Sequence, residues 1–357
     1  MITSSMRSIK NNALGTLLTL LVLAIVVFSM NPGSFYATGD NYSPEMNPGM
    51  VISRAINSPS INLYRALGVV NDSEQADIFR SMFYYIGDLF LPASVLSQLL
   101  AFSMLAIGSL SVKSLVDRIA RQRNIHVGPF PGFVGGVIYI STLWVVWIFN
   151  YPIMPYVVSF GLVPLLSLLI FRYITSETRP FRSLVQLLLI CILFSATAVV
   201  STVFIVSIGI FLIVEIYAWQ LSRVSTSFKR LIAGISLLFL VNAFWIVPFS
   251  RYVVVGSGNV IESSFNKAIT TTTIESEKAI MNLGNSVRMY TRHMELAEND
   301  KGEGTIFADA SNYSKDKYNS LIGYLPIVLS LTGLALLFYY KEKKDLWLWV
   351  GLLGFLY

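Results

Sequence analysis

Long apolar stretches separated by short polar ones occupy most of the chain. A transmembrane helix needs about 20 consecutive apolar residues, and eight runs with at most one charge reach or approach that length. These predicted spans cover residues 13–30, 89–112, 133–149, 154–171, 183–200, 202–221, 231–249 and 321–340. The pattern therefore predicts an all-α fold, a polytopic transmembrane helical bundle.

Two apolar runs do not have the length of a single transmembrane span. The run 183–221 can be read as one long helix, but its length fits two short spans joined at Val200–Ser201. A last run, 346–357, has only twelve residues before the sequence stops, which is too short to cross a bilayer as a helix. We therefore treat it as the start of a ninth span and expect the C-terminal part of the protein to be missing.

The polar segments between the spans differ in charge and in length. If the N-terminus is inside, fifteen of the 26 Lys and Arg residues fall in the short inner segments. The positive-inside rule applies to such short loops, so we expect a cytoplasmic N-terminus and two long extracytoplasmic loops, 31–88 and 250–320. The net charge of +6 is then a topology signal and gives no reason to predict nucleic-acid binding.

Composition agrees with a membrane protein. The mean hydropathy is +0.63 and 13% of residues are charged, against about 25% in soluble domains. Cys191 is the single cysteine, which excludes an intrachain disulfide, and His126 and His293 are too far apart for metal-ligand spacing. We expect an integral protein of the cell membrane, with lipid as its main surroundings.

The first outer loop contains two segments with helical apolar spacing. Residues 50–67 carry apolar side chains at mixed helical spacing, and Pro59 is expected to break this segment. Residues 74–84 place Ile78, Phe79, Met82 and Phe83 on one face. Both are predicted to be amphipathic helices that lie along the membrane surface.

Four motifs carry a resemblance to a known family. They are "TGDNYSPEMNP" at 38–48, "YPIMPYVVSFGLVPLLSLLIFRY" at 151–173, "NAFWIVPFSRYVV" at 242–254 and "NLGNSVRMY" at 282–290. With a first span followed by a large outer loop, the chain resembles the GT-C glycosyltransferases, more narrowly the prokaryotic arabinofuranosyltransferase type. The resemblance covers most of residues 1–357. It implies a polyprenyl-phosphate-linked sugar as donor and an extracytoplasmic glycan, lipid or protein as acceptor.

For Asp40, the resemblance implies a catalytic role, either as general base or as ligand of a divalent cation such as Mg²⁺ or Mn²⁺. A partly desolvated carboxylate at the interface has a raised pKa, which suits a base. The other interpretation is a turn, because Gly-Asp-Asn is strong turn chemistry. The loop lacks a D-x-D motif, which leaves the use of a metal unsettled. Glu45 is a possible second acid, a solvating group or a charge at a helix start.

Asp88, at the mouth of the second predicted span, is another possible acid or the cap of that span. Arg251, Arg288 and Arg292 are candidates to bind the donor phosphate, although snorkelling to lipid headgroups would also explain them. Trp245 either belongs to an aromatic belt or stacks on a sugar.

Glu215 lies inside a predicted span, where a charge usually faces a cavity. Because Arg223 follows near the inner end of that span, we interpret Glu215 as a snorkelling or ion-paired structural acid.

Three functions are compatible with this pattern. The first is glycosyl transfer from a polyprenyl-phosphate donor. The second is a transporter or flippase of a lipid-linked substrate, which would require polar groups and broken helices near the bilayer midplane. The third is a non-catalytic scaffold subunit. Polarity is concentrated in the two outer loops, so the sequence favours interfacial chemistry.

Overall fold

The fold was analysed in a computed structural model. It describes residues 2–29, 47–57, 61–62, 69–70, 74–124, 130–142, 145, 148–149, 153–176, 180–222, 224–255, 278, 284–285 and 317–339. Five of its helices are long and apolar enough to cross a membrane. The prediction of an all-α helical membrane bundle is confirmed, and the protein is an integral membrane protein.

The described elements are helices, apart from two short strands. Two two-residue strands form an antiparallel pair in which Ile61 lies opposite Val70. The elements are α1 (Ile2–Ser29), α2 (Pro48–Asn57), β1 (Ile61–Asn62), β2 (Val69–Val70), η1 (Glu74–Asp77), α3 (Ile78–Gly87), α4 (Ala93–Gln122), α5 (Phe130–Ile140), α7 (Met154–Thr175), α8 (Pro180–Phe194), η2 (Ser195–Val199), α9 (Ser201–Leu221), α10 (Ser227–Val255) and α15 (Lys317–Tyr339).

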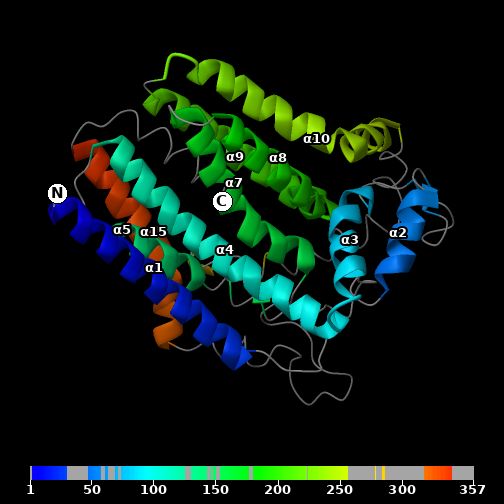
Figure 1. The fold of residues 1–357 in the computed structure, drawn as a ribbon, viewed down its shortest axis with the longest axis horizontal. Helices are drawn as coiled ribbons and strands as arrows, with labels where there is room; N and C mark the ends of the chain where they lie inside the picture. Colours follow the sequence, from blue (N-terminus) through cyan, green and yellow to red (C-terminus); the bar gives the residue numbers. More distant parts are fainter. Residues whose placement is uncertain are drawn as a thin grey trace.

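Helix α7 is the centre of the bundle. It packs against α4 on one side and against α8 and α9 on the other, while α1 and α5 cover α4 and α10 covers α8 (Figure 1). In its most apolar part, 78% of the residues are buried inside the protein, more than in any other described span. The short helices α2 and α3 lie together at one end of the long helices (Figure 1).

A proline in α7 shapes the contact between α4, α5 and α7. Pro164 has no N–H, so the carbonyl of Phe160, four residues earlier, loses its helical partner. The Tyr139 hydroxyl of α5 donates a hydrogen bond to this carbonyl at 2.7 Å, and the two rings stack with centroids 4.3 Å apart. A Cβ on Gly108 of α4 would lie 2.8 Å from the same oxygen. Glycine therefore lets the helices approach where the freed carbonyl needs a donor from outside its own helix.

The described helices differ from the predicted spans at several ends. The span predicted from Leu89 begins later, because α4 starts at Ala93 after Pro92 and continues to Gln122. Residues 89–91 belong instead to the turn that follows α3. Helix α5 ends at Ile140, earlier than the predicted end at residue 149. The ninth run, 346–357, lies outside the described residues.

The predicted division of the run 183–221 corresponds to a break in the helix. Helix α8 ends at Phe194, a short 3₁₀ segment follows, and Val200 has extended geometry with φ −105° and ψ 91°. Helix α9 then begins at Ser201. The two spans are therefore separate helices.

The two amphipathic helices of the first loop are both present. Asn47 begins α2 by accepting a hydrogen bond from the Met50 N–H through its side-chain oxygen, at 3.0 Å, and Pro48 takes the first helical position. Helix α2 ends at Asn57, before Pro59. Beyond Pro59 the expectation of a helix up to residue 67 is wrong at residues 61–62, which form strand β1. The second predicted helix begins as the 3₁₀ turn η1 and continues as α3 to Gly87.

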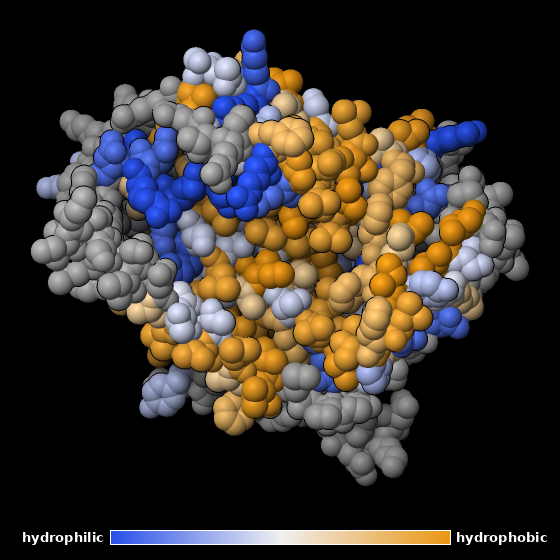
Figure 2. Space-filling view, viewed as in Figure 1, coloured by the Kyte–Doolittle hydropathy of each residue, from blue (hydrophilic) through white to orange (hydrophobic). Residues whose placement is uncertain are grey.

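The surface separates into apolar and hydrophilic regions. Apolar side chains cover most of the middle of the visible face, and hydrophilic ones gather at the end of the bundle where α4 finishes (upper left of Figure 2). Large apolar side chains also remain exposed on α3 and the turn after it, at Met82, Phe83, Ile86, Leu89 and Phe90. Such a surface fits a lipid environment.

Candidate functional site

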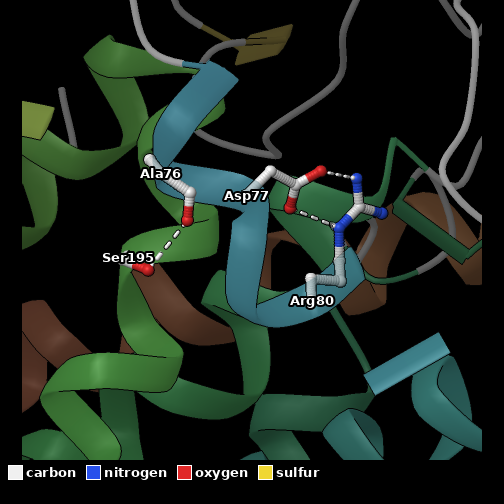
Figure 3. A network of polar contacts seen from close by, with 4 residues as sticks. All are labelled: Ala76, Asp77, Arg80 and Ser195. Atoms are coloured by element: carbon white, nitrogen blue, oxygen red, sulfur yellow. Dashed lines mark hydrogen bonds and ion pairs between the residues drawn. The ribbon is translucent and has the colours of Figure 1, made fainter. Parts of the chain in front are cut away.

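An ion pair is buried where η1 meets α3. The Asp77 carboxylate receives two hydrogen bonds from the Arg80 guanidinium, from Nε at 2.7 Å and from a terminal nitrogen at 2.6 Å. The two residues are only 6% and 8% exposed. Figure 3 shows both groups facing one another across one turn of the chain. A paired arrangement of this kind is the strongest form of a protein ion pair.

Local geometry explains why the pair forms. Asp77 is the residue before the first turn of α3, yet its carboxylate caps no backbone N–H of that helix. Spacing of three residues brings Asp77 and Arg80 onto the same side of the turn. The carboxylate is therefore used to hold Arg80, near a helix N-terminus that also favours negative charge.

A hydrogen bond attaches this segment to a distant part of the chain. The Ser195 hydroxyl of η2 donates to the Ala76 carbonyl of η1 at 2.8 Å (Figure 3). Both residues are fully buried. On the neighbouring α3, the Phe79 ring meets Phe244 of α10 edge-on, with centroids 5.9 Å apart. The segment η1–α3 is thus fixed onto η2, which follows α8, and onto α10.

Further polar side chains are buried on α3 and in the first turns of α4. Ser81, Tyr84, Ser97 and Gln98, from α3 and α4, are each at most 2% exposed. Within the described part of the chain, the Ser81 hydroxyl has no hydrogen-bond partner. A buried hydroxyl without a partner costs free energy, so burial of Ser81 is not explained by hydrogen bonding.

The apolar exposed side of α3 lies next to this polar corner. Met82 and Phe83 are 42% and 40% exposed, while Ser81 and Tyr84 are fully buried. The helix thus turns polar groups toward the bundle and apolar groups outward, as an interfacial helix does.

The described residues include only part of the predicted site. Asp40, Glu45, Arg288 and Arg292 lie outside them, so the predicted meeting of Asp40 with the arginines stays a prediction. Arg251 is exposed in the last turns of α10, after Pro248. It follows Phe244, the residue that contacts α3, so it lies at the same end of the bundle as the ion pair.

Two of the predicted residues differ in part from the expectation, while the possible role of Asp88 as an acid stays a prediction. Asp88 does not cap the second span, which begins after Pro92. It is instead the exposed residue that ends α3, with its N–H bonded to the Tyr84 carbonyl at 2.8 Å. Trp245 is 2% exposed, so its ring offers no free face to a sugar.

Trp245 is held on several sides. Its indole N–H donates to Asn242 at 3.0 Å. Its ring packs against Phe204 and Phe249, with centroids 4.7 and 6.0 Å away. It belongs to the core and not to an aromatic belt.

Glu215 is buried within α9, at 2% exposure. A Cβ on Gly234 of α10 would come within 2.7 Å of its carboxyl oxygen, so glycine makes room for the carboxyl group there. Arg223, the expected partner, lies outside the described residues. Within the described ranges, no three His, Cys, Asp or Glu side chains group together as a metal site would require.

The sequence interpretation did not identify Asp77, Arg80 and Ser195 as candidates. An Asp-x-x-Arg spacing at the start of an amphipathic helix was visible, but an exposed pair has the same spacing. Ser195 carried no signal, because its partner is 119 residues away in the chain.

Comparison with known proteins gives no further information on function. Neither a protein-family model, nor a curated protein, nor a solved structure matches the chain. The functional assignment therefore depends on the geometry of the site together with the sequence motifs.

Proposed function

We propose that the protein is a membrane glycosyltransferase that moves a sugar from a polyprenyl-phosphate donor to an acceptor outside the cell. The observation that supports this most is the buried Asp77–Arg80 pair under an apolar interfacial helix. It fixes the first loop at the end of the bundle where Arg251 also lies. A lipid-borne sugar phosphate would present its reacting carbon at the same depth.

The reaction would be a displacement at the anomeric carbon of the donor. Asp40 takes the proton from the acceptor hydroxyl, and the acceptor oxygen attacks the anomeric carbon. The bond between that carbon and the phosphate oxygen breaks, and the phosphate leaves with the bonding electrons. Arg251, with Arg288 and Arg292, would stabilise the negative charge on the departing phosphate.

Asp77 and Arg80 would act as positioning residues. Asp77 already binds Arg80 through both carboxylate oxygens, so it is not a free base. The pair would hold the first loop, and with it Asp40, against the bundle. Catalysis depends strongly on such positioning, because small displacements of a reacting group lower the rate sharply.

The test is a transfer assay with the purified full chain in liposomes. Radiolabelled polyprenyl-phosphate sugars are supplied as donors, and labelled product is measured for the unmodified protein and for Asp40→Asn. We expect transfer to fall at least 100-fold in the variant, the usual contribution of a general base. Asp72→Asn, the same change at another aspartate of the first outer loop that has no proposed role in the reaction, is the matched control and should retain the rate. Unchanged transfer in Asp40→Asn would remove Asp40 from the mechanism.

One observation favours a transporter instead, namely the carboxyl group of Glu215 buried inside a span. Transporters commonly use such groups. Glu215→Gln separates the two functions. A transferase should keep its transfer rate in this variant, whereas a proton-coupled or cation-coupled transporter should lose uptake into liposomes.

A further inference from the structure

The end of the bundle opposite the Asp77–Arg80 pair has its own polar network. The Gln122 side chain at the end of α4 donates to the Leu221 carbonyl at the end of α9, at 3.2 Å. Arg230, near the start of α10, donates to the Tyr173 carbonyl at 3.0 Å and also to the Ser176 carbonyl, at the end of α7. Two pairs of helices are therefore joined at this end, α4 with α9 and α10 with α7, and Arg230 is used to cap α7.

Arg118 and Arg172 lie level with each other in this region. Helices α4 and α7 run in parallel and end together, because Gln122 at the end of α4 binds the Leu221 carbonyl of α9, and the Ser222 hydroxyl after α9 binds the Ile174 carbonyl near the end of α7. In the middle of the pair, Gly108 comes close to Phe160 and Met104 to Gly161. The difference in residue number between Arg118 and Arg172 lies between the differences for these two contacts. In a parallel pair, the two arginines therefore lie at a similar height along the helices. Arg172 is in turn one of the charges that act on Arg118.

Arg118 is a partly buried cation with two like charges near it. The side-chain Nε of Arg118 is buried and has no hydrogen-bond partner among the described residues. The two charges that act on it are those of Arg172 and Arg121, both positive. Like charges at close range repel, and a buried donor without an acceptor costs free energy.

The carboxylate nearest in sequence does not neutralise this cluster. Asp117 is engaged by Lys113 at 2.8 Å, and both side chains are largely buried. In the part of the chain that the structure describes, Arg118, Arg121 and Arg172 have no ion pair with a carboxylate. Hydrophilic side chains gather on the surface at the same end, where α4 finishes (Figure 2).

We propose that Arg118, Arg121 and Arg172 form a binding site for a phosphate group. The planar guanidinium pairs with two phosphate oxygens at once, and several arginines around one anion are typical of phosphate sites. The phosphate belongs either to the headgroup of an anionic lipid or to a soluble phosphate compound. The site is at the other end of the bundle from the proposed transfer chemistry and does not depend on it.

The test measures phosphate binding to the purified full chain in a neutral detergent. Three probes are used, namely a phosphatidylglycerol, a phosphatidylcholine and inorganic phosphate, with binding followed by native mass spectrometry. We expect phosphatidylglycerol to bind more tightly than phosphatidylcholine. Arg118→Gln and Arg172→Gln should each weaken this binding at least tenfold. The matched control is Arg182→Gln, which removes an exposed arginine at the start of α8 and should change it less than twofold.

The variants also keep the test informative if Arg118→Gln does not fold. Arg118→Lys preserves the charge but not the forked donor, and it should weaken binding several-fold. Displacement of phosphatidylglycerol by inorganic phosphate would support the site and indicate a soluble ligand. Retention of the lipid in excess phosphate would support the site and indicate a headgroup.

Three results would overturn the proposal. The first is equal binding of phosphatidylglycerol and phosphatidylcholine without any effect of inorganic phosphate. The second is an equal loss in Arg182→Gln, which would mean that only the general positive charge matters. The third is unchanged binding of phosphatidylglycerol in both Arg118→Gln and Arg172→Gln.

Discussion

The freed carbonyl of α7 leads to a quantitative prediction. Pro164 leaves the Phe160 carbonyl without a helical donor, and the Tyr139 hydroxyl supplies one at 2.7 Å. Tyr139→Phe removes only that donor, because the phenylalanine ring can keep the stacking at 4.3 Å. Leaving a buried acceptor unsatisfied costs about 1–3 kcal/mol, whereas measured hydrogen bonds between membrane helices average about 0.6 kcal/mol. We expect a loss of about 1 kcal/mol in the free energy of unfolding.

The cause is isolated by a double-mutant cycle with Pro164→Ala. Alanine restores an N–H that reaches the Phe160 carbonyl within α7, so the Tyr139 hydroxyl becomes redundant. Unfolding of the four proteins by denaturant in mild detergent gives the coupling free energy. Tyr139→Phe should then cost less in the Pro164→Ala background, by about the size of the lost hydrogen bond. An exposed hydroxyl, removed by Tyr85→Phe, serves as control. Equal costs of Tyr139→Phe in both backgrounds would refute the reasoning.

Three further predictions concern stability. Gly132→Ala should lower the unfolding temperature, at a cost of about 1–3 kcal/mol, because its Cβ would come within 2.7 Å of a backbone oxygen of α4. Gly135→Ala meets nothing closer than 3.4 Å and should leave that temperature unchanged or raise it. Asp77→Ala and Arg80→Ala should each destabilise the fold by about 3–5 kcal/mol, because each leaves one buried charge unpaired, while replacement of both residues by leucine should cost much less. Thermal unfolding would contradict this if the stability lost by the double variant equalled the sum of the two single losses. Asn47→Ala should cost about 1 kcal/mol and speed hydrogen exchange in α2 alone, and unchanged exchange there would show that the cap is dispensable.

Much of the bundle is predictable from the sequence because lipid leaves the backbone few choices. In the hydrocarbon core every backbone polar group needs a partner within the protein, and a helix supplies it locally. An apolar run of sufficient length therefore predicts a helix without knowledge of its neighbours. The break at Val200 follows from the same reasoning, since the run around it is too long for one span. Helix ends are less predictable, as Pro92 shows by starting α4 after the apolar run has begun.

The buried ion pair shows what the sequence alone does not contain. Asp77 and Arg80 have the composition and spacing of a solvated surface pair. Their burial depends on η2, whose Ser195 binds Ala76 from 119 residues away. The partner of the Phe160 carbonyl is not predictable either. Pro164 indicates from the sequence that this carbonyl lacks a helical donor, but only the packing of α5 on α7 shows that Tyr139 reaches it.

The proposed chemistry requires that the first loop faces the outside of the cell. This orientation can be measured by cysteine labelling, because Cys191 is the only native cysteine and can be replaced by alanine. Single cysteines are then placed at Asn41, beside Asp40, and at Lys229, exposed at the start of α10. With a membrane-impermeant maleimide on intact cells, we expect Asn41→Cys to be labelled and Lys229→Cys to react only after permeabilisation. The reverse pattern would place Asp40 on the cytoplasmic side and contradict the proposed function.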